Sequence, residues 1–175
     1  GGIPSKYGGR LSSVLDIYQK EGNNKEFKLT GGIGLISSRI LAEGPLKKEK
    51  SSFLIGGRSS YAHLFLPLID NNNVAYFYDL NTKFNYRLNK NNNIFLSAYF
   101  GKDVFGINNS FINKYGNAVT NLRWNHLFSD KLFSNLSLIY SDYFYGLILD
   151  FVGFEWDSGI TNINFKYDFN HYLKD

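Results

Sequence analysis

The residues best suited to metal binding or catalysis are three histidines, and their spacing argues against a metal site. His63, His126 and His171 lie far apart, form no H-x-x-x-H motif and stand in a chain without cysteine. Structural and catalytic zinc sites need several ligands at short, fixed spacings. We therefore expect neither a metal nor another cofactor. His126 follows Trp124 near a predicted turn, which is typical of a residue at a membrane–water interface.

Other chemical motifs are also incomplete. The stretch Gly32-x-Gly34-x-x-Ser37 lacks the third glycine and the following helix of a phosphate-binding loop. Serine, histidine and aspartate occur, but no nucleophile elbow accompanies them, so we predict that the protein is not an enzyme. The net charge is +4 and the pI about 9.1. Because the basic residues are scattered and form no stripe, we expect no nucleic-acid partner.

The composition and the hydrophobic pattern predict an all-β protein. The chain has 16 Phe, 13 Tyr and 17 Gly but only 3 Pro among 175 residues, which suits strands joined by Gly and Asn turns. Side chains alternate with period 2 from Tyr76 to Leu88, and the same pattern recurs at 94–103, 121–128 and 162–170. Each predicted strand thus has an apolar face, rich in Tyr and Phe, and a polar face.

The aromatic character of the apolar faces favours a transmembrane barrel over a soluble sandwich. Aromatic residues crowd the ends of the predicted strands, as in the girdles of outer-membrane barrels. Lumen-facing residues of such barrels are polar, and charges in a plugged lumen usually pair across strands or with the plug, with direct ligand contact as a second role. We predict that the following charged residues face the lumen: Arg58, Asp79, Lys83, Arg87, Asp103, Arg123, Asp142, Lys166 and Asp168.

The links between predicted strands alternate in length. Links at 46–50, 89–92 and 129–131 are short, whereas those at 67–73, 106–116 and 152–158 are long. Outer-membrane barrels join strands by tight periplasmic turns and long extracellular loops. A phase change in the pattern predicts a further hairpin near 36–38. The count is then about eight strands after residue 25.

The order of the motifs resembles a known family. The stretches of this chain that carry the resemblance are Pro4–Ile17, Gly31–Arg39 with Glu43–Pro45, Lys50–Ile55 with Gly57–Arg58, Tyr78–Asn81, Leu96–Asp103 and Leu122–Phe128. In this order they resemble the end of the plug and the first barrel strands of TonB-dependent outer-membrane receptors of the Bacteroidetes type. The family has a whole plug with a TonB box and a barrel of about 22 strands. The resemblance therefore implies a fragment of that architecture.

The resemblance divides the chain and implies a function. Residues 1–24 would be the end of the plug and its junction with the barrel, and 25–175 the N-terminal part of the transmembrane β-barrel. Tyr7, Gly8, Gly9 and Arg10 would form the junction, where glycine permits a tight bend. The parent receptor would import a siderophore, oligosaccharide, peptide or vitamin across the bacterial outer membrane. Its partners would be that nutrient, membrane lipid and TonB, which it would reach through the missing N-terminal part.

Other architectures remain open from the residues alone. Eight strands can close into a self-contained outer-membrane barrel with a structural or adhesive role. A soluble lipocalin-type barrel would instead need an apolar lumen, whereas the predicted interior carries Asn, Lys, Asp and Arg. An open curved sheet would leave unpaired edges that lipid does not tolerate.

Overall fold

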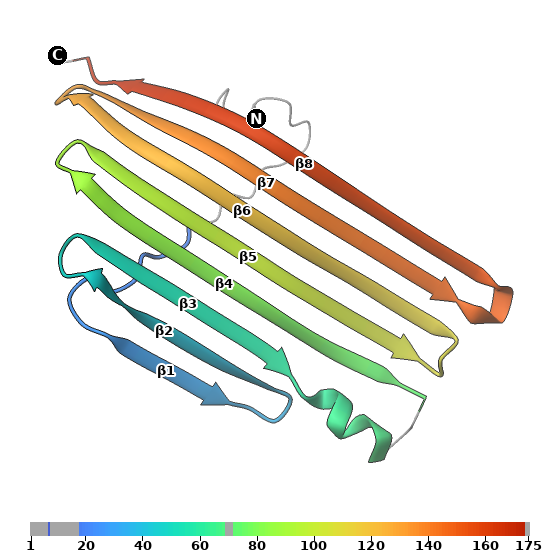
Figure 1. The fold of residues 1–175 in the computed structure, drawn as a ribbon. Helices are drawn as coiled ribbons and strands as arrows, with labels where there is room; N and C mark the ends of the chain where they lie inside the picture. The colour runs from blue at the N-terminus through green and yellow to red at the C-terminus, as the bar shows by residue number, and fades with distance from the viewer. Residues whose placement is uncertain (1–6, 8–17, 69–71, 174–175) are drawn as a thin grey trace.

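The computed structural model describes residues 7, 18–68 and 72–173, and they form one antiparallel sheet. Eight strands follow one another in chain order, with β1 and β8 at the two edges (Figure 1). The strands are β1 (Lys28–Ile33), β2 (Ser37–Lys47), β3 (Ser51–Ser60), β4 (Val74–Asn89), β5 (Asn92–Ile107), β6 (Phe111–Ser129), β7 (Leu132–Leu149) and β8 (Phe154–His171). The predictions of an all-β fold and of about eight meandering strands are confirmed.

Within residues 18–68 and 72–173, helical structure is limited to three short 3-10 helices. They are η2 (Ala62–Leu64), η3 (Leu66–Leu68) and η4 (Asp150–Val152). Among residues 7, 18–68 and 72–173, no helix has the length and apolarity needed to cross a membrane.

The cross-strand register keeps the two faces of the sheet distinct over its whole width. One row of directly opposed residues is apolar and runs through Phe84, Leu96, Leu122, Leu138 and Phe165. The neighbouring row lies on the other face and runs through Asn85, Phe95, Arg123, Ser137 and Lys166. We call the side of the first row the apolar face and the side of the second row the polar face.

The apolar face is exposed. Leu122 on β6 and Leu138 on β7 are 45% and 49% accessible, and Phe165 on the edge strand β8 is 70% accessible. Among the described residues, the buried hydrophobic side chains are Leu54, Phe95 and Val104. Since soluble monomers seldom expose such a large continuous apolar surface, the face requires a cover of lipid or protein.

The turns agree in part with the predicted links. Three tight turns, at 48–50, 90–91 and 130–131, coincide with the predicted short links and define what we call the tight-turn end of the sheet. The hairpin predicted near 36–38 is also present, with its turn at 34–36. The long link predicted before β4 spans 61–73 and includes η2 and η3.

The other two long links were predicted wrongly. Between β5 and β6 the turn occupies only 108–110, with Asn108 and Asn109 both at φ 52°. Between β7 and β8 it occupies 150–153 and ends at Gly153 with φ 63°. Asparagine and glycine adopt this left-handed conformation readily, so the chain reverses at once and the strands extend further than their polarity pattern suggests.

Candidate functional site

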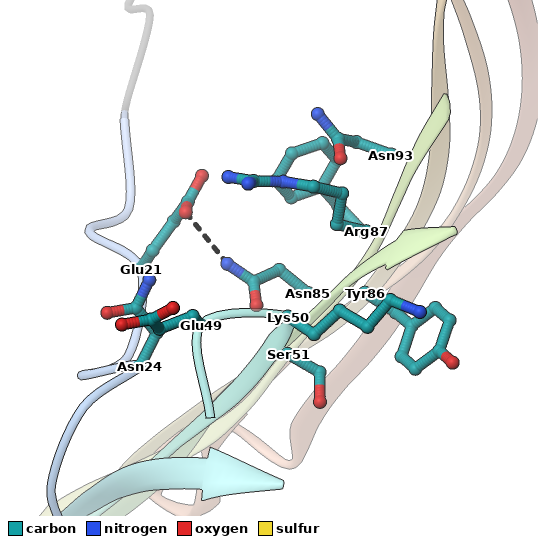
Figure 2. Close-up of a pocket in the computed structure, with 10 residues that line it drawn as sticks. Glu21, Asn24, Glu49, Lys50, Ser51, Asn85, Tyr86, Arg87 and Asn93 are labelled. Atoms are coloured by element: carbon teal, nitrogen blue, oxygen red, sulfur yellow. Dashed lines mark hydrogen bonds between the residues drawn. The ribbon is translucent and has the colours of Figure 1, made fainter. Parts of the chain in front are cut away.

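The segment 18–27, which we call the strap, lies across the polar face before the chain enters β1. The Lys83 ammonium donates a hydrogen bond to the backbone oxygen of Gln19 at 2.6 Å. Two residues along β4, the Asn85 amide donates to a carboxylate oxygen of Glu21 at 2.7 Å (Figure 2). The strap is therefore anchored to side chains that the alternation of β4 places on the polar face.

The strap continues across the sheet to β2. Lys20 forms an ion pair with Glu43 at 2.9 Å, and the other carboxylate oxygen of Glu43 accepts the backbone N–H of Asn23 at 3.1 Å. The backbone N–H of Glu49, in the turn after β2, donates to the backbone oxygen of Asn24 at 3.0 Å. Polar contacts to β2, the following turn and β4 thus fix the strap over its length.

One glycine allows the strap to approach the sheet closely. A Cβ added at Gly22 would overlap the backbone oxygen of Phe53 and would stand 3.2 Å from the backbone nitrogen of Leu54. The obstacle is backbone, which cannot rotate away as a flexible side chain can. Leu54, opposite Lys83 in the register, is only 4% accessible. Gly22 therefore permits the contact between strap and wall.

A small hollow remains beside the strap at the tight-turn end. Its volume is about 110 Å³, and its lining includes Glu21, Asn85, Arg87 and Asn93. Figure 2 shows Asn85 and Arg87 extending from the sheet toward Glu21. This arrangement of an acid, an amide and a guanidinium contains no nucleophile with a paired base.

Cations and aromatic rings form the next part of the polar face. Phe95, 8% accessible, lies between the Arg123 guanidinium, 4.5 Å from the ring centre, and the Lys83 ammonium, 5.9 Å from it. On the far side of β4, Arg58 forms an ion pair with Asp79 at 2.7 Å. The Phe95 ring thus holds Lys83 and Arg123 by cation–π contacts, where few carboxylates are available to pair with them.

Buried polar atoms of β6 lack hydrogen-bond partners. They are Oδ1 of Asn121, Nε of Arg123 and Oδ1 of Asn125, at three successive polar-face positions. An unsatisfied buried group costs about 1–3 kcal/mol. The centre of the polar face therefore retains unused hydrogen-bonding capacity.

The register brings most of the predicted lumen-facing residues to one side of the sheet. Cross-strand pairing places these on the polar face: Arg58, Asp79, Lys83, Arg87, Asp103, Arg123, Lys166 and Asp168. The expected pairing across strands occurs between Arg58 and Asp79, whereas Lys166 and Asp168 pair along one strand at 3.1 Å.

Asp142 was assigned to the wrong face. It stands opposite Ala118 and Thr161 on the apolar face, where the Thr161 hydroxyl donates to its carboxylate at 2.6 Å. After Tyr140, β7 carries large apolar residues on both faces, including Tyr143 and Phe144. The alternation there does not reveal which face is polar.

The predicted junction is described at one residue. The Tyr7 ring centre lies 5.8 Å from the Lys166 ammonium, over β8. Gly8, Gly9 and Arg10 lie outside the described residues. The strap anchors Gln19, Glu21 and Gly22 were not predicted, because a segment held by its backbone and by mixed charges has no periodic pattern.

Neither a group of metal-binding residues nor a comparison with known proteins assigns a function to this site. No group of three or more histidine, cysteine or acidic residues that could hold a metal occurs in the part of the chain that the structure describes. No protein-family model, curated protein or solved structure matches the chain.

The close approach of the strap to the backbone of Phe53 predicts that one methyl group added at Gly22 would displace the strap. Gly22→Ala should lift the strap and expose Lys20 and Lys25 to trypsin. Hydrogen bonds are worth about 0.5–1.5 kcal/mol each, so losing two or three should speed cleavage at least about fivefold. Gly31→Ala is the control, since its Cβ would stand 3.8 Å from the nearest backbone atom. Equal cleavage of both variants would show that the strap is not held against Phe53.

Proposed function

We propose that the chain is part of the wall of an outer-membrane β-barrel of the TonB-dependent receptor class. The parent receptor would import a scarce nutrient (a siderophore, oligosaccharide, peptide or vitamin) with energy relayed by TonB. The observation that carries the proposal is the exposed apolar face, which a barrel turns toward lipid. The polar face then lines the lumen.

An aromatic girdle at the tight-turn end supports a membrane position for this face. Tyr86, Trp124 and Tyr167 belong to one row across the sheet. The Trp124 indole donates to Oδ1 of Asn92 at 3.0 Å, and the His126 ring nitrogen Nδ1 lies 2.8 Å from the same oxygen. Rings with one apolar body and one hydrogen-bonded end suit the membrane interface.

Charged residues mark the limit of the apolar face at the end of the sheet opposite the tight turns. Lys102 stands opposite Gly116, and Lys114 and Asp157 both stand opposite Gly146. Asp142, opposite Ala118, is the first charge on this face when β6 is followed from the tight-turn end. From Phe128 to Ala118, β6 rises about 34 Å at ~3.4 Å per residue, or about 24 Å in height at a tilt of about 45°. This height is close to the ~25 Å apolar band of outer-membrane barrels.

The strap fits the proposed division of the chain at residue 24. A segment that precedes the first wall strand and lies on the polar face has the position expected of the end of a plug inside the lumen. Its contacts with Glu43, Lys83 and Asn85 would join this segment to the wall. The parent receptor would engage TonB through parts that precede this segment.

A self-contained eight-stranded barrel is the alternative, favoured by the strand count. It requires β1 and β8 to pair, yet β1 has 6 residues and β8 has 18. Such a pair would leave most of the β8 edge unsatisfied in lipid. The larger barrel, in which β8 pairs with a following strand, avoids this cost.

Neighbouring substitutions on β5 test the lipid-facing assignment. Leu96→Arg places a charge on the apolar face, and Ser97→Arg places it on the polar face. A midplane arginine facing lipid costs about 2–4 kcal/mol, so Leu96→Arg should lower the folded fraction in vesicles across a urea titration. Ser97→Arg should lose less, since its cost is limited to repulsion by Lys83, directly opposite in the register. Equal losses would contradict a lipid-facing role for Leu96.

The reading frame around the encoding gene tests the receptor assignment. We expect an upstream plug with a TonB box and further strands of alternating pattern downstream. A signal peptide immediately before Gly1 together with a stop codon after Asp175 would overturn the receptor proposal and favour the small closed barrel.

A further inference from the structure

We propose that the polar face of β6–β8 carries a binding site for a polyhydroxy carboxylate, a sugar acid in chemical class. One row of the sheet places Arg123, Ser137 and Lys166 on three successive strands. Strands lie about 4.8 Å apart, so the two cations flank Ser137 across a backbone span of about 10 Å. A carboxylate above Ser137 would lie between two positive charges.

Arg123 is available to an anion and is already oriented. Among the described residues it forms no ion pair, since the carboxylates in such pairs are Glu26, Glu43, Asp79 and Asp168. Its guanidinium is held against Phe95 at 4.5 Å. A guanidinium fixed by an aromatic ring loses less conformational entropy when it binds a planar carboxylate.

Lys166 is the second cation, and its present ion pair is weak. Its partner Asp168 is two residues further along β8, and both side chains are more than one third accessible. Exposed pairs of this kind contribute little. The cluster of Arg123, Lys166 and Asp168 therefore keeps a net positive charge, which suits one carboxylate.

The surrounding groups suit hydroxyls. Asn121, Asn135 and Ser137 line a hollow of about 580 Å³ together with Arg123 and Lys166. Amide and hydroxyl side chains both donate and accept hydrogen bonds, so they match the hydroxyls of a sugar, which do the same.

The size and the aromatic lining favour a sugar ring over a small inorganic anion. The hollow falls in the usual range of about 300–1,000 Å³ for ligand sites. Tyr7 and Tyr18 line the same hollow, and tyrosine can pack against the C–H groups of a sugar. The hollow beside the strap is only about 110 Å³. This inference rests on the proposed function in one respect, since a nutrient would meet the site inside the lumen.

Titration of the full chain in lipid vesicles with galacturonate and with galactose tests the site. Galacturonate should bind at least about tenfold more tightly than neutral galactose, because charged hydrogen bonds are worth about 1.5–3 kcal/mol. Arg123→Gln should remove this preference, and Arg123→Lys should keep part of it. Arg58→Gln, whose arginine pairs with Asp79 outside the hollow, is the control and should bind like the parent chain.

Two readouts separate this inference from the proposed function. Protection from protease by the vesicles reports insertion, and calorimetry reports sugar binding. Insertion without a preference for galacturonate, or equal binding by Arg123→Gln and the parent chain, would overturn the site and leave the barrel assignment intact. Binding of galacturonate by a chain that stays outside the bilayer would support the site and contradict the membrane proposal.

Discussion

The structure depends on one constraint, the register that keeps alternate side chains on the same face across eight strands. A slip of one residue in any pair would turn a whole strand over, bringing charges among aromatic rings. The opposed rows through Leu122 and Arg123 show the result, since these neighbours in sequence belong to an entirely apolar row and a largely polar one. The two faces thus meet different surroundings, and this difference carries the functional proposal.

The polar face is organised by what the register brings together. Lys83 and Arg123 come from strands separated by β5 and meet on either side of Phe95. The same face receives the strap, whose contacts are mostly with side chains and the backbone of β2, β4 and the turn between β2 and β3. Beyond the strap, Arg123, Ser137 and Lys166 line an open hollow over β6–β8, which is why we place a ligand there.

The sequence alone predicted strands and turns correctly where the hydrophobic pattern is local and periodic. The strand from Tyr76 to Leu88 and the tight turns at 90–91 and 130–131 follow from alternation and from clusters of polar turn residues. The pattern failed at Asp142, where both faces of β7 are apolar, and at the turn 108–110, where strand pairing extends into sequence that resembles a loop. The strap could not be predicted because its place depends on contacts such as Lys83 with Gln19, which are far apart in sequence.

The central claim is that the apolar face contacts lipid and the polar face does not. The chain has 2 tryptophans, and the register places them on opposite faces. Trp124 belongs to the girdle on the apolar face, and Trp156 lies on the polar face with its ring centre 5.8 Å from that of Tyr145. Trp156 also adjoins Asp157, beyond the apolar band, so the test variants carry phenylalanine at both positions and a single tryptophan at one depth on either face, as Leu96→Trp or Ser97→Trp. In vesicles of brominated lipid, the Leu96→Trp variant should lose much of its fluorescence, whereas the Ser97→Trp variant should stay bright and be quenched by aqueous iodide. Equal quenching of both variants by the lipid, or stronger quenching of the Ser97→Trp variant, would contradict the account.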